Sequence, residues 1–272
     1  MNGPAVLDDH TFARFADLIY SEAGITLGSH KHSLVAARLG KRMRSLGIGR
    51  FEDYFAYVRE DGAGGELVML IDAISTNVTQ FYREAVHFEI LDTLLRRWRN
   101  EGQSRFRVWC AAASTGEEPY TLAITLAEAL GDVSDVRILA TDISTRALAA
   151  ARRGRYEAKK VETVPREFLG KYFASTGSGS ERFYQVREGL RRMLKFARLN
   201  LATPPFPMKG PLDVVFCRNV MIYFDQRVRQ LLVDEIHRLL RPGGYLMVGH
   251  SESLTGLGNT FRAVKPSVYV KD

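Results

Sequence analysis

The sequence predicts an α/β domain with a mainly parallel sheet, preceded by a small domain built only of helices. Three patterns lead to this fold class. Apolar residues recur at helical spacing through most of the first 75 positions. Beyond about residue 84, apolar runs of strand length alternate with helical segments. Between 156 and 196 a glycine- and serine-rich turn breaks that alternation, which predicts a small inserted β structure.

Residues 1–75 are assigned to the helical domain. The spacing of Phe12, Phe15 and Ile19 is typical of an amphipathic helix, and similar patterns follow it. A further helix is expected at 66–74. Breaks that contain glycine, at 24–28, 47–49 and 61–65, separate these helices.

Residues 76–90 are expected to form a linker that contributes to a ligand site, and residues 91–272 the α/β domain. Strands are predicted at 106–110, 136–140, 212–217, 245–248 and 268–270, with helices at 84–99, 117–130, 145–152 and 226–240. This alternation implies parallel strands joined by helices that cover both faces of a sheet. In the insertion, two strands at 182–186 and 192–196 are expected to pair in antiparallel fashion.

Composition and charge restrict the class of protein without fixing a function. The chain is 46% hydrophobic and has a formal net charge of +7, so an acidic protein surface, nucleic acid or anionic lipid are all compatible partners. No apolar run reaches the length of a membrane span and no signal peptide is recognisable, which favours the cytoplasm. Cys110 and Cys217 each fall in a strand and are interpreted as core residues, forming neither a disulfide nor a metal site.

The loop at 111–119 follows one predicted strand and opens a helix. Its small residues allow a ligand to approach the backbone, and open α/β sheets bind ligands beyond the carboxyl ends of their strands. Helix capping by Ser114 or Thr115 explains the same residues. Asp142 ends the next strand, where an acid either accepts hydrogen bonds from ribose hydroxyls or caps the following helix. Because the G-x-G-x-x-G and P-loop patterns are absent, the arrangement favours an adenosyl ligand other than NAD.

Two further segments place polar residues among apolar ones. The strand at 212–217 runs directly into Arg218 and Asn219, and Tyr223 follows. These residues either line a crevice at the strand end or belong to an ordinary strand-to-loop transition. In the linker, the guanidinium of Arg83 can bind the carboxylate of a ligand or form a salt bridge between the two domains.

Taken together, these segments resemble the CheR family of chemoreceptor glutamate methyltransferases. Six motifs carry the resemblance in chain order: TNVTQFYRE at 76–84, VWCAAASTGEEPY at 108–120, ATDIS at 140–144, Asn200-Leu201, FCRNVMIYF at 216–224 and GHSE at 249–252. The resemblance implies an all-α N-terminal domain and a Rossmann-like methyltransferase domain with a β-subdomain inserted at about 156–196. It also implies S-adenosylmethionine as the cofactor, with S-adenosylhomocysteine as its product. No metal ligands are predicted.

By the same resemblance, nine residues are expected to contact S-adenosylmethionine: Asn77, Thr79, Arg83, Glu117, Asp142, Asn200, Leu201, Arg218 and Asn219. Asp142 is expected to hold the ribose and Arg83 the methionine carboxylate. The last four residues are expected to surround the adenine and methionine parts.

The implied reaction is attack of a glutamate carboxylate on the sulfonium methyl group, which yields a glutamyl methyl ester. A carboxylate is ionised at neutral pH, so no general base is needed, and alignment of the reactants supplies much of the rate. Tyr223 is predicted to lie near the methyl group, and Arg99 to orient the incoming carboxylate. The basic run at 96–99 is also explained as the solvated end of a helix.

The implied partners are the acidic cytoplasmic methylation helices of chemoreceptors. Lys31, Arg38 and Lys41 fall within about 80° of one another on a helix, and Arg38 and Lys41 are predicted to bind the receptor. Whether the β-subdomain also binds a receptor C-terminal tail stays open. A cytoplasmic monomer that neither binds nucleic acid nor inserts into a membrane is expected.

Two other functions use similar cofactor segments. One is a small-molecule or nucleic-acid methyltransferase, although the N-P-P-Y type motif of base amino-group methylation is absent. The other is a non-catalytic S-adenosylmethionine sensor that binds nucleic acid through its basic domain. The presence of Asp142, Glu117 and Tyr223 argues against a loss of activity.

Overall fold

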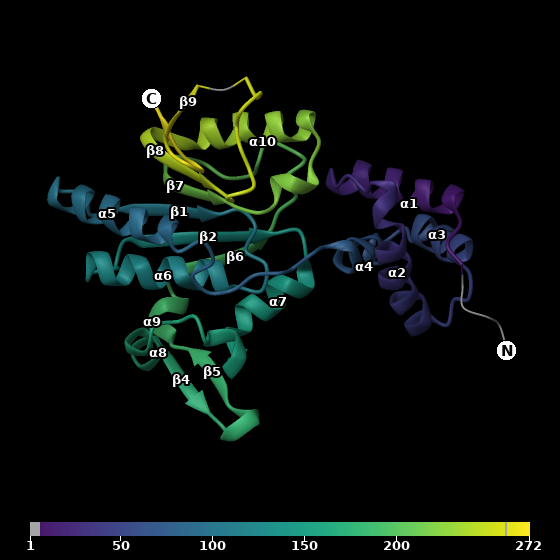
Figure 1. Cartoon of the computed structure of the whole chain (residues 1–272), viewed down its shortest axis with the longest axis horizontal. Coiled ribbons are helices and arrows are strands. Elements are labelled where there is room, and N and C mark those ends of the chain that lie inside the picture. The colour runs from purple at the N-terminus through teal and green to yellow at the C-terminus, as the bar shows by residue number, and fades with distance from the viewer. Residues whose placement is uncertain (1–5, 259) are drawn as a thin grey trace.

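The computed structural model describes residues 6–258 and 260–272. The described N-terminal part, purple to blue in Figure 1, contains α1 (Asp9–Ala23), η1 (Ser29–Lys31), α2 (His32–Leu46), α3 (Phe51–Glu60) and α4 (Gly65–Ile74). The apolar stripes of these helices meet in one core that includes Phe15, Leu39 and Tyr54. Asp8 caps α1 by accepting a hydrogen bond from the Thr11 N–H at 2.8 Å. The all-α N-terminal domain expected from apolar spacing is confirmed.

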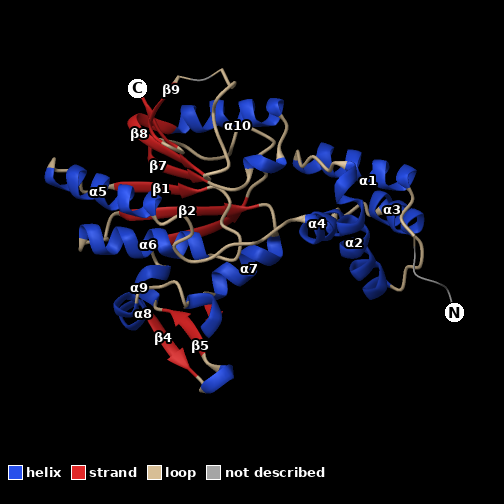
Figure 2. Cartoon of the chain, viewed as in Figure 1, coloured by secondary structure: helices blue, strands red, loops and turns tan. Residues whose placement is uncertain are grey.

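The second domain is a sheet with helices on both faces (Figure 2). Its strands lie in the order β6 (Leu194–Arg198), β2 (Val136–Asp142), β1 (Phe106–Cys110), β7 (Leu212–Cys217), β8 (Leu240–Val248), β10 (Val268–Lys271) and β9 (Phe261–Lys265). Neighbouring strands from β6 to β8 are parallel, whereas β10 is antiparallel to both of its neighbours. The accompanying helices are α5 (Val86–Asn100), α6 (Glu117–Leu130), α7 (Thr145–Arg153), η4 (Met221–Tyr223) and α10 (Gln226–Leu239). The predicted α/β class with a mainly parallel sheet is confirmed.

Strand β1 shows why both faces of the sheet are covered. Val108 and Cys110 belong to a core shared with α5 and α6, while Trp109 belongs to a core shared with α10. Successive residues of a strand point to opposite faces, and all three side chains are buried. A strand buried on both faces has a continuous apolar sequence, which is the pattern that predicted it.

The inserted β-subdomain, at the bottom of Figure 1, differs in detail from the prediction. Its antiparallel strands are β3 (Arg155–Glu157), β5 (Phe183–Val186) and β4 (Phe173–Thr176), accompanied by η2 (Ala158–Val161), α8 (Arg166–Tyr172), η3 (Gly179–Glu181) and α9 (Glu188–Arg191). The expected antiparallel strand at 192–196 is wrong, because these residues lead into β6, which pairs in parallel with β2 from Ile138 and Leu194. A short apolar run does not reveal which sheet it joins, and here the parallel partner lies far back in the chain.

Direct contacts hold the helical domain against the carboxyl ends of the strands. Ile25 forms an isolated antiparallel bridge with Phe224. The buried carboxylate of Asp72 accepts a hydrogen bond from the Thr145 hydroxyl at 2.6 Å, at the start of α7. The irregular segment 75–85 connects the two domains between α4 and α5. None of the described helices is both long and apolar enough to cross a lipid bilayer.

Candidate functional site

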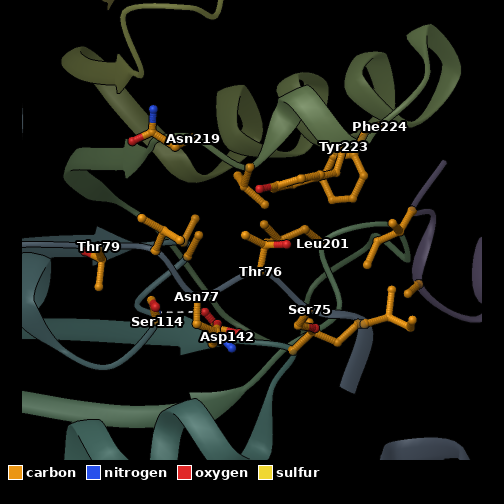
Figure 3. A pocket seen from close by; sticks show the side chains of 18 of the residues that line it. Ser75, Thr76, Asn77, Thr79, Ser114, Asp142, Leu201, Asn219, Tyr223 and Phe224 are labelled. Carbon is orange, nitrogen blue, oxygen red and sulfur yellow. Dashed lines mark hydrogen bonds between the residues drawn. The ribbon is translucent and has the colours of Figure 1, made fainter. Parts of the chain in front are cut away.

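A cleft lies at the carboxyl ends of β1, β2 and β7, next to the helical domain. Its empty volume is about 1180 Å³, including the open space at its mouth. Figure 3 shows Asn77, Ser114 and Asp142 on one side of this cleft, with Asn219 and Tyr223 on the other. The chain order of the strands reverses between β1 and β7. Such a reversal is where open α/β sheets bind their ligands.

Most residues that were expected to contact the cofactor lie in this single cleft. The residues that line it are Asn77, Thr79, Arg83, Asp142, Asn200, Leu201, Arg218 and Asn219. They come from the linker and from the ends of β2, β6 and β7. The described residue Glu117 is the exception and does not line the cleft.

Asp142 joins two loops through its buried carboxylate. Oδ2 accepts a hydrogen bond from the Ser114 N–H at 2.8 Å, and Oδ1 accepts one from the Ser144 N–H at 2.9 Å. Burial raises the pKa of Asp142, and these backbone donors oppose the rise. The cap of α7 is Ser144, whose hydroxyl accepts from the Ala147 N–H, so Asp142 is not needed as a helix cap. The hydroxyl of Ser114 is buried in the cleft wall without a hydrogen-bond partner in the described chain.

The two glutamates that open α6 point in different directions. Glu117 is fully buried, accepts a hydrogen bond from the Thr115 hydroxyl at 2.6 Å and lies 3.2 Å from the ammonium of Lys160. Its carboxylate therefore ties α6 to the β-subdomain. Glu118 lines the cleft instead. Adjacent residues of a helix differ by about 100° in direction, so the motif in the sequence does not show that Glu118, and not Glu117, faces the cleft.

Arg218, directly after β7, lies between two carboxylates. Its buried guanidinium places Nη1 2.9 Å from Glu118 Oε2 and Nη2 3.0 Å from Glu84 Oε2. Burial opposes the ionisation of Glu84, but the charge of Arg218 outweighs it and the pKa of Glu84 lies below its usual value. At Glu118 burial prevails over Arg218 and raises the pKa. The cleft wall thus contains a buried guanidinium that is paired with a carboxyl group on each of two sides.

The loop that carries Arg218 and Asn219 is fixed by Glu252, whose role the sequence alone does not reveal. The carboxylate of Glu252 accepts hydrogen bonds from the N–H groups of Asn219, Val220, Met221 and Gly249, at 2.7, 2.9, 2.8 and 2.6 Å. A Cβ atom on Gly249 would lie 2.4 Å from Asn219 Nδ2, so the close approach requires glycine. The GHSE motif thus braces the loop after β7. Its presence was visible in the sequence, but the contact that explains it was not.

Several non-glycine residues at or beside the cleft have a left-handed backbone. The φ angles are 55° at Tyr82, 56° at Glu84, 48° at Ser114 and 57° at Asn219. Such conformations cost roughly 1–3 kcal/mol each and persist only where surrounding contacts impose them. Here the contacts are the Glu84–Arg218 pair and the backbone hydrogen bonds to Asp142 and Glu252. Strain of this kind gathers at functional sites.

Asn200 and Arg83 are each held by a hydrogen bond to a backbone carbonyl. Asn200 donates from Nδ2 to the carbonyl of Glu22 at 2.8 Å, which links the loop after β6 to the helical domain. Leu201 beside it is 6% exposed. In the linker, Arg83 donates from Nη1 to the carbonyl of Val78 at 3.0 Å. The guanidinium thus folds over its own segment at the cleft wall.

The helical domain brings two cations to the cleft. Lys31 lines it, with its ammonium 5.3 Å from the centroid of the Tyr223 ring. Arg38 lines it as well, but its guanidinium donates to the Ser75 carbonyl at 3.3 Å and to the Thr76 hydroxyl at 3.2 Å. Arg38, on the basic side of α2, therefore binds the linker, and helical periodicity alone cannot reveal this contact.

Besides Glu117, two other predicted residues lie outside the cleft. Lys41 is exposed on α2 and does not line it. Arg99 is exposed near the end of α5; hydrogen bonds from Ser134 and the charge of Arg99 both lower the pKa of Asp132. Asp132 precedes β2, so Arg99 lies at the edge where the strands begin, opposite the cleft. This placement does not support Arg99 as the residue that orients a substrate.

The sequence of the chain is similar to known proteins over both domains. Residues 77–270 match the family described as CheR methyltransferase, SAM binding domain, and residues 10–75 match CheR methyltransferase, all-alpha domain. The chain is 40% identical over 264 residues to the chemotaxis protein methyltransferase of Escherichia coli K12, covering 97% of this chain and 91% of that protein. It is 39% identical over 259 residues to chemotaxis protein methyltransferase 2 of Pseudomonas aeruginosa, with coverage of 95% and 91%. It is also 36% identical over 268 residues to the chemotaxis protein methyltransferase of Borreliella burgdorferi, with coverage of 96% and 93%.

Proposed function

The chain belongs to the CheR methyltransferase family, and on that premise we propose that it converts glutamate side chains of chemoreceptors to glutamyl methyl esters. As a member of this family it is an S-adenosylmethionine-dependent methyltransferase of chemotaxis. The observation that carries the proposal is the cleft itself. Groups suited to each part of the cofactor converge there, next to a cation that can receive an acidic acceptor.

The residues of the cleft fit S-adenosylmethionine. Asp142 offers a carboxylate beside the unpartnered hydroxyl of Ser114, a pair suited to ribose hydroxyls. The planar guanidinium of Arg83 is suited to the methionine carboxylate. Glu118 supplies negative charge in the wall, which favours the positively charged groups of the cofactor. These four residues form our proposed set for holding it, together with the other expected residues that line the cleft.

The chain has to align a carboxylate with the electrophilic methyl group that S-adenosylmethionine supplies when bound. The acceptor glutamate arrives ionised, so no residue needs to remove a proton. Holding two reactants in position can lower a barrier by about 7–11 kcal/mol. We assign this task to Lys31 and Tyr223, which lie together at the part of the cleft shared by the two domains. In this proposal Lys31, and not Arg99, orients the incoming carboxylate.

The receptor docks, in this proposal, on the basic side of the helical domain. The exposed ammonium of Lys41 is available for acidic side chains of a methylation helix, and Arg38 lies closer to the cleft. The β-subdomain is then a second contact for a receptor C-terminal tail. The proposed enzyme acts as a cytoplasmic monomer without binding nucleic acid.

The choice of acceptor is tested by offering labelled S-adenosylmethionine with three acceptors in parallel: chemoreceptor-containing membranes, DNA and free dicarboxylic acids. We expect label on the receptor and none above background on the other two. Label on DNA or on the free acids, with none on the receptor, would overturn the proposed acceptor class.

A further inference from the structure

Three metal-ligating side chains meet behind the cleft: Glu84, His87 and His250. One donor atom from each lies within 4.8 Å of the other two. Glu84 Oε2 is 3.5 Å from His87 Nδ1 and 3.9 Å from His250 Nε2. Donors held 2.0–2.2 Å from a tetrahedral zinc ion stand roughly 3.3–3.6 Å apart. The two glutamate–histidine pairs stand close to this spacing, and side-chain rotation within the cluster can bring all three donors onto one zinc ion. Sequence alone could not show the cluster, because Glu84 and His250 are 166 positions apart.

His87 gives an independent reason to expect a ligand. The side chain is 1% exposed, and neither ring nitrogen has a hydrogen-bond partner in the described chain. Leaving buried polar atoms unpaired costs free energy, and a bound ion removes part of that cost.

His250 lies between the buried His87 and solvent. Its side chain is 56% exposed, and its ring centroid lies 5.2 Å from that of His87. The exposed ring of His250 therefore places one edge of the cluster next to solvent. Two imidazoles and one carboxylate, with water in the fourth position, form a donor set that suits zinc. Magnesium and calcium prefer oxygen donors and are not expected to bind here.

The cluster is connected to the cleft because Glu84 already has other partners. Its Oε2 lies 3.0 Å from Arg218 Nη2 and accepts from the His250 N–H at 3.2 Å, while Oε1 accepts from Asn219 Nδ2 at 3.3 Å. Arg218 and Asn219 line the cleft. A dication on Glu84 repels the guanidinium of Arg218 and competes for its anionic partner.

We propose that Glu84, His87 and His250 form a zinc site, and that zinc bound there takes Glu84 away from Arg218 and weakens the binding of S-adenosylmethionine. The coupling rests on the proposed cofactor cleft, whereas the zinc site does not. Linkage makes the effect reciprocal, so the cofactor weakens zinc binding by the same factor. S-adenosylhomocysteine lacks the sulfonium charge and is expected to be affected less.

Zinc binding is tested with untagged, metal-free protein, titrated with zinc chloride against a chromophoric zinc chelator in the absence of cofactor. We expect one zinc ion per chain and a loss of about tenfold or more in affinity for His250→Ala. Because His250 is exposed, its removal leaves the core intact. The matched control is His10→Ala, which removes an exposed histidine from the helical domain and should not change zinc affinity. Equal affinity in the wild-type chain and His250→Ala overturns the site.

The coupling is tested by calorimetric titration of S-adenosylmethionine and S-adenosylhomocysteine with and without saturating zinc. We expect zinc to lower the affinity for S-adenosylmethionine by about fivefold or more, to lower that for S-adenosylhomocysteine less, and to change neither in His250→Ala. An unchanged affinity in the zinc-saturated wild-type chain overturns the coupling. If S-adenosylmethionine fails to bind without zinc, the proposed function fails, and the zinc titration still decides the site.

Discussion

The guanidinium of Arg218 lies 2.9 Å from the carboxylate of Glu118, across 100 positions of sequence. The other carboxylate oxygen of Glu118 accepts a hydrogen bond from the Cys110 thiol at 3.2 Å. This contact joins the end of β1, the start of α6 and the loop after β7 into one wall of the cleft. Two motifs that seemed separate in the sequence are therefore parts of a single structure.

Glu118, and not Glu117, should determine cofactor affinity. We expect Glu118→Gln to weaken the binding of S-adenosylhomocysteine by about tenfold or more, because hydrogen bonds to charged groups contribute about 1.5–3 kcal/mol. Glu117→Gln is the matched control from the adjacent position, and it should change the affinity by less than about threefold. Calorimetric titration measures both. Equal losses in the two variants would contradict the orientation of α6 described above.

Lys31 should act on methyl transfer and not on cofactor binding. We expect Lys31→Met to lower kcat/KM for the receptor by about 10–100-fold, since the acceptor carboxylate loses the cation that aligns it. Affinity for S-adenosylhomocysteine should stay within about twofold. Arg99→Ala, at the opposite edge of the sheet, should leave both quantities unchanged. A loss of transfer in Arg99→Ala together with normal transfer in Lys31→Met would reverse the assignment.

Glu252 should contribute to stability as well as to the site. Replacing it with glutamine removes the charge that four N–H donors share, and we expect the free energy of unfolding to fall by about 2–3 kcal/mol. Urea denaturation measures this change. The exposed residue Glu181 serves as the control, because Glu181→Gln should leave the unfolding midpoint unaltered. Wild-type stability in Glu252→Gln would show that the loop does not need this brace.

Glu66 should make the helical domain sensitive to acid. Its carboxylate accepts hydrogen bonds from Arg42 Nε at 2.9 Å and from the Tyr54 hydroxyl at 2.8 Å. Burial opposes its ionisation, but these partners outweigh burial and hold the pKa of Glu66 below its usual value. A lowered folded-state pKa stabilises the protein above the unfolded pKa, near 4.3, and that stability is lost as pH falls through the folded pKa.

We therefore expect the melting temperature to decline below about pH 4.3. Glu66→Gln should be less stable by about 3 kcal/mol at pH 7, because it leaves Arg42 without its charge partner. Below pH 4 its stability should fall less steeply than that of the wild-type chain. Thermal melts across this range measure both effects, and parallel curves for the two proteins would contradict the role of Glu66.

The location of the site could be predicted from sequence because it follows from strand ends. Asp142 and Arg218 each follow a buried strand, and the carboxyl ends of parallel strands meet at one edge of a sheet. Motifs placed directly after strands therefore had to converge. The fold class followed for a related reason, since burial on both faces gives strands a continuous apolar sequence.

What could not be predicted depends on contacts between distant segments or on side-chain direction. The motif at the start of α6 does not show which glutamate turns inward. The basic run at 96–99 does not show which edge of the sheet it reaches, and only the direction of α5 places Arg99 at the edge opposite the cleft. Lys31 reaches Tyr223 only because the helical domain docks at the strand ends. The parallel pairing of β6 could not be predicted, because its partner β2 lies far back in the chain.

The proposed function requires that this cleft holds S-adenosylmethionine and that its methyl group passes to a receptor carboxylate. The most direct measurement is the release of labelled methanol by base from receptor membranes incubated with labelled S-adenosylmethionine and either the wild-type chain or Asp142→Ala. We expect base-labile label with the wild-type chain and none above background with a folded Asp142→Ala variant. Base-stable label, or equal base-labile label with both proteins, would contradict it.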